Sequence, residues 1–338
     1  MQPTSMDLRS KISTQVDLSK QGAQHGHLTV PHSRNESPWG SLLVPISVFA
    51  NGDGPTVLFI GGNHGDEYEG PIALLRMIRE LQADQIKGRV IILPALNYPA
   101  LKAGTRLSPV DGKNMNRAFP GSANGTVTEM VADYVYRYIL PLCDAVVDIH
   151  AGGRMMSFLP TAVIHRLPDA QQMAHTVAAV KAFGAPNTLV LEELDAGGML
   201  DTAVEDMGKI FISTELGGGG TTTRETVNIA VDGVRNVLKH FGMLPGEPEG
   251  ETTRFLETPD GAFVIAESNG LFECHVNPGD SVSQGDILGT IHDIDAPTEE
   301  PKNYLTPMDG IVMHRHVAGQ ILRGDCLSVI AVPTEEFD

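Results

Sequence analysis

Three residues of types that bind metal ions stand at or just beyond the ends of two apolar segments. His64 and Glu67 lie three residues apart in the string GGNHGDEYEG, and His150 ends the string VVDIH. Two histidines and one carboxylate are a common protein ligand set for catalytic zinc, which keeps a fourth position open for water or substrate. A polar loop after a strand would explain either string alone. Together, the two strings predict a zinc site.

The two strings are expected to meet because of the strands that carry them. Residues 57–62 and 145–150 are short apolar runs, as is typical of buried strands. Glycines around His64 let the chain turn sharply after the first strand. In an open parallel sheet, ligands bind outside the carboxyl ends of the strands. Both strands therefore direct metal-binding side chains toward one crevice.

A loop rich in glycine and proline offers cationic and amide side chains. The string GTRLSPVDGKNMNRAFPG carries Arg106, Asn116 and Arg117. Loops often display functional side chains, and a guanidinium group matches a carboxylate in a two-pronged way. A second guanidinium near the metal could stabilise a developing oxyanion. The alternative is two surface arginines on a long loop.

A carboxylate precedes four glycines in the string FISTELGGGG. Glu215 ends a predicted strand there. A carboxylate in this place could take a proton from a water molecule and pass it to a leaving amine. Its alternative role is an ordinary acidic residue in a turn.

Apolar and amphipathic segments alternate through the first two thirds of the chain. Strands are predicted at 57–62, 89–96, 145–150, 188–191 and 209–216, and helices at 70–82, 128–142, 169–183 and 222–241. This alternation predicts an α/β fold with a mainly parallel mixed sheet and helices on both faces. The run SLLVPISVF, residues 41–49, is expected to add an antiparallel edge strand.

The composition changes at residues 246–251, which are Gly, Pro and Glu. Beyond them, short strands alternate with Gly-Asp and Pro-Gly turns, with no convincing helix. We therefore predict a catalytic domain over residues 1–245 and an all-β domain over residues 246–338. Two strings, NPGDSVSQGD and PMDGIV, resemble the barrel-sandwich domains that carry biotin or lipoate. No lysine stands at a hairpin tip between them, so the resemblance implies the fold and not the modification.

Composition narrows the class of protein. The chain has 338 residues, 41% of them hydrophobic, without an apolar stretch long enough to span a membrane and without a secretory signal. We expect a cytoplasmic protein. Three widely spaced cysteines predict free thiols. A net charge of −18 argues against nucleic acid as a partner and suits a small-molecule substrate. These data leave open whether the chain forms a homo-oligomer.

The order of these motifs resembles that of a known enzyme family. His64-x-x-Glu67, Arg106, the pair Asn116-Arg117, Asp148-Ile149-His150 and Glu215 follow one another as in the succinylglutamate desuccinylase and aspartoacylase family of zinc carboxypeptidase-like enzymes. The resemblance covers about residues 55–242. A smaller β-domain after the catalytic domain is also usual in that family.

The resemblance implies a role for each matched residue. One zinc ion per chain would be held by His64, Glu67 and His150. Arg106 would polarise the scissile carbonyl, Asn116 and Arg117 would bind the substrate's α-carboxylate, and Glu215 would act as general base and then general acid. The family also implies that Asp148 lies beside His150, although we expect these two side chains to point to opposite sides of their strand.

Within the family, the strings PWGSLLVPISVFANG, GGNHGDEYEGP and KNMNRAFPG resemble most the branch that deacetylates N2-acetyl-L-2,4-diaminobutanoate during ectoine breakdown. The side-chain amine of that substrate is cationic and would need a carboxylate partner. The segment LEELDAGGMLD offers four acidic residues, which are Glu192, Glu193, Asp195 and Asp201. Their alternative role is that of solvated loop residues.

Other functions remain open at this stage. An aspartoacylase or a succinylglutamate desuccinylase would use the same ligands and mechanism on a different N-acyl amino acid. A zinc carboxypeptidase would use the same ligands to cleave a peptide's terminal residue. A non-enzymatic binding module would have no need for three ligands and Glu215 together. Fold-level similarity alone does not decide the substrate.

Overall fold

The computed structural model describes residues 9–192, 197–250 and 252–337. Its main feature is a mixed sheet of 15 strands. At the centre, β5 (Gly88–Leu93), β4 (Thr56–Gly61), β6 (Ala145–Ile149) and β10 (Ile210–Glu215) lie side by side and run parallel. Every residue of β4 and β6 is buried. The carboxyl ends of these strands therefore share one edge, as the sequence predicted.

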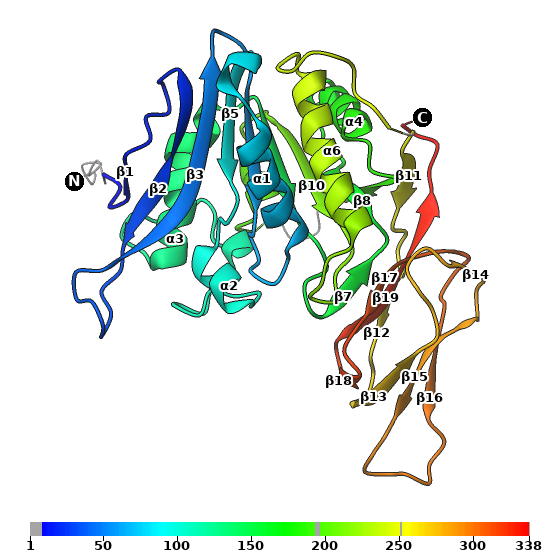
Figure 1. The fold of residues 1–338 in the computed structure, drawn as a ribbon. Coiled ribbons are helices and arrows are strands. Elements are labelled where there is room, and N and C mark those ends of the chain that lie inside the picture. Colours follow the sequence, from blue (N-terminus) through cyan, green and yellow to red (C-terminus); the bar gives the residue numbers. More distant parts are fainter. Residues whose placement is uncertain (1–8, 193–196, 251, 338) are drawn as a thin grey trace, which may run out of the picture.

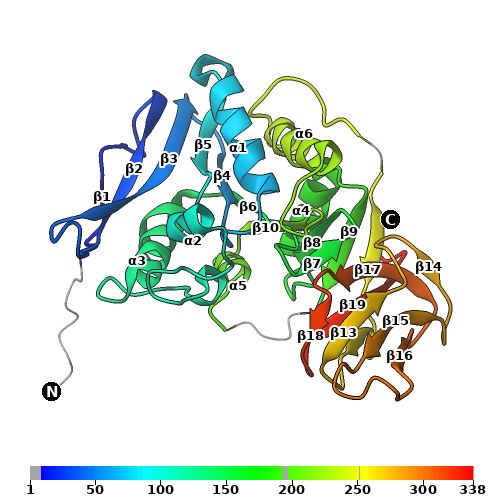
Figure 2. The same ribbon diagram turned by 60° about the horizontal axis from the view of Figure 1, so that its bottom comes forward.

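Helices cover both faces of this sheet (Figures 1 and 2). Alternate residues of β4 belong to different cores, with Val57 and Phe59 in one and Leu58 and Ile60 in the other. The first core also contains residues of α1 (Glu69–Glu80), α4 (Ala170–Phe183) and α6 (Arg224–His240). The second contains residues of α3 (Val127–Tyr134) and α5 (Leu200–Glu205). Burial on both faces explains why the strand reads as a continuous apolar run.

The helices begin at residues that favour helix starts. Thr126 forms a capping box with Glu129 at the start of α3, and the Asp169 side chain accepts a hydrogen bond from the backbone N–H of Gln172 in α4. After α3 the chain continues through a π-helical turn (Val135–Ile139) and a 3-10 turn (Leu140–Leu142). All four predicted helices and all five predicted strands are confirmed.

Further strands extend the mixed sheet on both sides of this centre, and among them β1 (Ser13–Thr14), β2 (Gly22–Pro31) and β8 (Thr161–His165) were not predicted from the sequence. The predicted strand 41–49 is β3 (Ser41–Asn51), which is antiparallel to β5 as expected. It is not an edge strand, because β2 pairs with its other side and β1 pairs with β2. On the opposite side, β8 runs antiparallel to β10 and parallel to β9 (Asn187–Leu191).

The C-terminal region is all-β in its described part, as predicted. Its strand β11 (Arg254–Glu257) pairs with β9, and β19 (Cys326–Pro333) extends the same sheet toward β17 (Gly310–His316) and β14 (Ser281–Val282). β12 (Phe263–Ile265) also pairs with β19. The main sheet thus crosses residue 246, and the proposed domain boundary stays a prediction.

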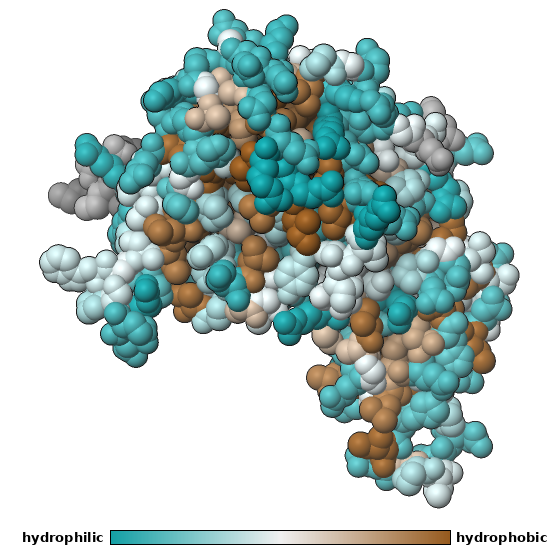
Figure 3. All heavy atoms as spheres, in the orientation of Figure 1, coloured by the Kyte–Doolittle hydropathy of each residue, from teal (hydrophilic) through white to brown (hydrophobic). Residues whose placement is uncertain are grey.

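A second sheet completes the C-terminal region. It has four strands in the order β16 (Lys302–Leu305), β15 (Ile287–His292), β13 (Gly270–Cys274) and β18 (Gln320–Ile321). A separate core that includes Leu288, Val312 and Ile330 lies in this region. Its surface carries exposed hydrophobic side chains, among them Ile294 and Leu322. Figure 3 shows brown patches on this region, at the lower right.

One expectation from composition has a structural counterpart. The three cysteines are free thiols, as predicted. Among the described residues, no helix has both the length and the apolar character needed to cross a membrane.

Candidate active site

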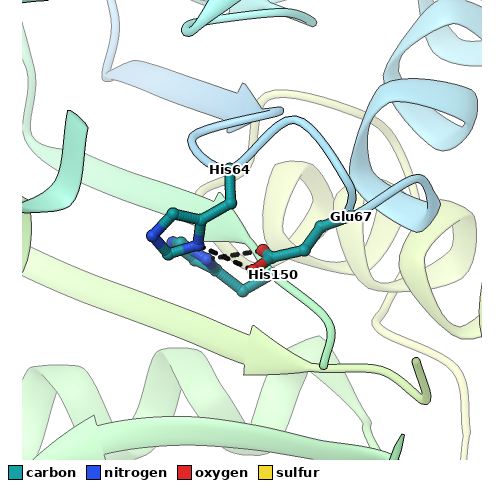
Figure 4. A group of neighbouring side chains, drawn as sticks. All are labelled: His64, Glu67 and His150. Carbon is teal, nitrogen blue, oxygen red and sulfur yellow. Dashed lines mark hydrogen bonds and ion pairs between the residues drawn. The ribbon is translucent and has the colours of Figure 1, made fainter. Parts of the chain in front are cut away.

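His64, Glu67 and His150 come together at the carboxyl ends of β4 and β6 (Figure 4). Their possible ligand atoms lie within 4.8 Å of one another, and all three residues are buried. Nδ1 of His64 lies 2.7 Å from Glu67 Oε1, and Nδ1 of His150 lies 2.8 Å from Glu67 Oε2. The crevice expected from the two strand ends therefore exists, with the three expected side chains in it.

The turn after β4 depends on glycine. A Cβ atom at Gly65 would lie 1.9 Å from the carbonyl carbon of Ala100, in the helix α2 (Tyr98–Ala103). No side chain fits in that space. The backbone N–H of Gly65 also donates to the carbonyl of Thr105. This close packing fixes the loop from which His64 and Glu67 project.

The second ring nitrogen of each histidine is held by a hydrogen-bond partner. Nε2 of His64 lies 3.1 Å from Asn114 Oδ1, and Nε2 of His150 lies 2.8 Å from Asp148 Oδ2. Asn63 in turn donates to Asp148 Oδ2 at 2.7 Å. With Nε2 donating its proton outward, each Nδ1 is directed toward the centre of the three residues. The donor set therefore fits a divalent metal ion.

The contact between Asp148 and His150 confirms the family's implication and corrects our own expectation. We expected the two side chains to point to opposite sides of the strand. Residues two apart on a strand lie on the same face, so the alternation argument was wrong as applied. The carboxylate orients the imidazole and raises its basicity.

Charge interactions hold the three residues together. Burial by itself would raise the pKa of Glu67, but the charges and hydrogen bonds of His150 and His64 hold that pKa well below its usual range. Burial would lower the pKa of His150, but Asp148 and Glu67 raise it well above its usual value. A bound cation would replace the protons that now link these atoms, so metal binding would be coupled to proton release.

Arg106 reaches this group from the loop after α2. That helix ends at Gly104, which adopts a left-handed conformation. Nη1 of Arg106 lies 3.3 Å from His64 Nδ1 and 3.5 Å from Glu67 Oε1. Its side chain is 46% exposed, so one part touches the buried residues and another faces the open side.

Asn116 and Arg117 stand on a 3-10 turn (Met115–Arg117) at the same opening. The Asn116 side-chain oxygen accepts a hydrogen bond from the backbone N–H of Leu200 at 3.1 Å. Arg117 donates from Nη1 to the carbonyl of Asn116 at 2.8 Å. The turn is thus fastened to the start of α5.

Glu215 lies at the end of β10, tied to the end of β6. The backbone N–H of Leu216 and the hydroxyl of Thr214 both donate to the carbonyl of His150, at 3.1 and 3.0 Å. Burial and then the neighbouring charge of Glu67 raise the pKa of Glu215 to about 8. A carboxyl group whose pKa lies near neutrality can both accept and donate a proton at physiological pH.

One cavity of about 370 Å³ connects these residues. Glu67 lies behind its surface, whereas the other predicted site residues line it, namely His64, Arg106, Asn116, Arg117, His150 and Glu215. Its far wall comes from the C-terminal region and includes Phe263, Met313, His314, Cys326 and Val329. The cavity is therefore closed on one side by residues distant in sequence from the metal-binding strings.

The four acidic residues considered for an amine partner fall into three groups. Glu192 is exposed, forms an ion pair with Arg166 at 2.7 Å and is not among the residues that line the cavity. Glu193 and Asp195 lie outside the described residues. Asp201 is buried and lines the cavity.

Sequence reasoning missed three polar residues around the site. Asn63 and Asn114 hold the carboxylate and the imidazole described above. Both stand inside strings that had been singled out, but an asparagine carries no distinctive chemical signal. His165 also lines the cavity, and its Nδ1 lies 3.1 Å from Glu205 Oε2.

Comparisons with known proteins agree with this geometry. Residues 53–241 match the succinylglutamate desuccinylase/aspartoacylase catalytic domain. The N-alpha-acetyl-L-2,4-diaminobutyric acid deacetylase of Halomonas elongata is 44% identical over 331 residues, which are 97% of each chain.

Two solved structures are similar over almost the whole chain. The product-bound ectoine utilization protein EutE (DoeB) of Ruegeria pomeroyi has 46% sequence identity and a TM-score of 0.93, covering 96% of this chain and 99% of that one. A succinylglutamate desuccinylase of Silicibacter sp. TM1040 has 45% identity, the same TM-score and the same coverage.

Proposed function

Because the chain belongs to the succinylglutamate desuccinylase/aspartoacylase family, we propose that this deacylase hydrolyses N2-acetyl-L-2,4-diaminobutanoate to diaminobutanoate and acetate. The convergence of His64, Glu67 and His150 with Arg106 and Glu215 around one cavity carries the proposal. The name of the Halomonas elongata relative supports the choice of substrate.

The metal would be one zinc ion per chain, held by Nδ1 of His64, Nδ1 of His150 and the carboxylate of Glu67. Two nitrogen donors and one carboxylate are the ligand set of many catalytic zinc sites. When bound, zinc supplies Lewis-acid polarisation of a carbonyl oxygen and lowers the pKa of water. Asp148 and Asn114 would keep the two imidazoles in the ligating orientation.

The protein's own groups would move protons and stabilise charge. Glu215, with a pKa raised to about 8 by burial and by Glu67, would take a proton from the attacking water and return it to the departing amine. The Arg106 guanidinium would donate to the carbonyl oxygen as it gains negative charge. Asn116 and Arg117 would hold the α-carboxylate at the opening of the cavity.

The wall contributed by the C-terminal region favours a small substrate. Phe263, Met313 and Val329 of that region line the same cavity as Arg117, and its volume of about 370 Å³ suits a small molecule better than a peptide. This observation supports an N-acyl amino acid over a carboxypeptidase substrate. Family membership and the assembled residues speak against a non-enzymatic binding module. We also propose that the catalytic region has a carboxypeptidase-like fold and the C-terminal region a barrel-sandwich fold. The protein would be cytoplasmic and could form a homo-oligomer.

Amine release from three N-acyl amino acids tests the substrate. Zinc-loaded protein would be given N2-acetyl-L-2,4-diaminobutanoate, N-acetylaspartate and N-succinylglutamate in parallel. We expect strong preference for the first. Preference for either dianionic substrate would retain the deacylase chemistry but overturn the substrate, and cleavage of none would overturn the proposal.

A further inference from the structure

A buried carboxylate lies on the cavity wall, at a distance in sequence from the proposed metal ligands. We propose that Asp201 binds the side-chain ammonium group of the substrate and thereby selects cationic N-acetyl amino acids. Asp201 is the second residue of α5, lines the cavity and is only 7% exposed. The inference rests on the proposed function and names the residue that would set its specificity.

Asp201 is held beside the turn that is proposed to bind the α-carboxylate. The backbone N–H of Leu200 donates to Asn116 Oδ1 at 3.1 Å, and the N–H of Phe119 donates to the carbonyl of Gly198 at 3.0 Å. A Cβ atom at Gly198 would lie 2.6 Å from the carbonyl oxygen of Arg117, so the two segments are closely packed. This packing places a cationic and an anionic side chain on the wall of one cavity.

That charge arrangement complements the proposed substrate. N2-acetyl-L-2,4-diaminobutanoate has a carboxylate and an ammonium group separated by a short carbon chain. With the carboxylate at Arg117, the ammonium group would need an acceptor nearby. Among the described residues that line the cavity, the two acidic ones are Asp201 and Glu215. Glu215 lies next to His150, at the end of the cavity that contains the proposed metal ligands and is called the metal end below, so we assign the amine to Asp201.

The apolar part of the cavity wall would strengthen an ion pair at Asp201. The cavity wall also includes apolar side chains, Val163, Leu189, Leu191, Met199 and Phe211. Charges interact more strongly in such surroundings than in water. Oδ1 of Asp201 already accepts a hydrogen bond from the N–H of Thr202 at 2.6 Å. An ammonium ligand would add a charged donor.

A second carboxylate adds negative charge on the same helix. Glu205 lies one helical turn after Asp201, and its side chain is 9% exposed. It contacts Nδ1 of His165, which also lines the cavity. The helix α5 therefore contributes the carboxylate of Asp201 to the cavity wall and the carboxylate of Glu205 next to the His165 imidazole. This negative charge favours a cationic over an anionic substrate side chain.

Substitution of Asp201 by asparagine tests the charge without removing the side-chain oxygen. In Asp201→Asn, the amide oxygen can still accept from the Thr202 N–H, so the start of α5 keeps its hydrogen bond. The neutral comparison substrate is N2-acetyl-L-norvaline, which has a methyl group in place of the ammonium group. Asp206→Asn is the matched control, because Asp206 is exposed and ends the same helix.

The measurement is kcat and KM of each protein for both substrates. For Asp201→Asn we expect KM for the cationic substrate to rise about 10- to 100-fold, as for loss of one charge-assisted hydrogen bond, with little change for N2-acetyl-L-norvaline. Asp206→Asn should match the wild type on both.

Equal losses on both substrates would show that Asp201 has only a structural role and overturn the proposal. An unchanged preference for the cationic substrate in Asp201→Asn would overturn it while leaving the deacetylase function in place. Wild-type protein that hydrolyses neither substrate would overturn the proposed function and, with it, this assignment.

Discussion

Two ends of one cavity contain buried histidines, and the histidines differ in their neighbours. At the metal end, His64 and His150 are 3% and 6% exposed, and every ring nitrogen lies near a carboxylate or amide oxygen. At the end formed by the C-terminal region, His314 is 1% exposed. Within the described residues, neither of its ring nitrogens has a hydrogen-bond partner. Its ring packs against Phe158, with 5.1 Å between centroids.

The neighbours, and not the burial, decide what each histidine can do. Asp148 and Glu67 overcome the effect of burial and raise the pKa of His150 well above its usual value. Burial and then His316 lower the pKa of His314 to about 4, so that ring is neutral at physiological pH. A histidine among carboxylates is suited to bind a metal ion, whereas one between apolar side chains is suited to packing. Substitutions at the two ends should therefore have different consequences.

The largest effect is expected from removal of Glu67, which contacts both histidines of the proposed metal site. Glu67→Ala should lose the metal and lower kcat/KM by about a thousandfold or more, because metal-ion catalysis contributes several kcal/mol to transition-state stabilisation. Elemental analysis of the purified protein and amine release measure the two effects. Circular dichroism would check the fold. A variant with a full complement of metal would remove Glu67 from the ligand set.

Glu215 tests proton transfer apart from metal binding. Glu215→Gln keeps the size of the side chain but cannot accept or donate the catalytic proton, so kcat should fall about 10²- to 10⁴-fold. Metal content should equal that of the wild type, because Glu215 is not among the three clustered ligands. Steady-state kinetics and elemental analysis on the same preparation give both values. Near-normal turnover would exclude Glu215 as the general base.

A smaller effect is expected at Asp148, which touches the metal end only through His150. Asp148→Asn keeps an oxygen near Nε2 of His150 but removes the charge that raises the pKa of the imidazole. Metal affinity should fall about 10- to 100-fold. Competition with a chelator of known affinity measures the change. An unchanged affinity would mean that the hydrogen bond alone, without the charge, orients His150.

The clustering of the three proposed metal ligands could be predicted from the sequence because these residues follow strand ends. His64, Glu67 and His150 were found from two apolar strands and the rule that the carboxyl ends of parallel strands share one edge. Asn114 could not be found in the same way, because its contact joins residues 50 positions apart through a loop. Local periodicity does not report such contacts.

The end of the cavity that the C-terminal region forms could not be predicted from the sequence, again because it depends on contacts between remote segments. It is built by pairing of β17 with β7 (Met156–Phe158), two segments that are remote along the chain. The helix α5, which carries Asp201, has only six residues and shows little periodicity. A strand of three residues and a helix of six are stabilised by their neighbours, so only the folded structure reveals them.

The smallest effect, and the sharpest test of the comparison, is expected at His314. Its pKa is about 4 in the folded protein, against 6.5 for an ordinary histidine, mainly because of burial. As pH falls below 6.5 the unfolded chain takes up the proton first, so the wild type loses stability between pH 6.5 and about 4.

The variant His314→Leu has no imidazole and does not show this loss. Its free energy of unfolding relative to the wild type should therefore be about 1 kcal/mol higher at pH 5.5 than at pH 8. Urea unfolding at both pH values measures the difference. The metal content of the variant should equal that of the wild type. If the stability difference between the variant and the wild type is the same at both pH values, His314 is not held neutral by its apolar surroundings.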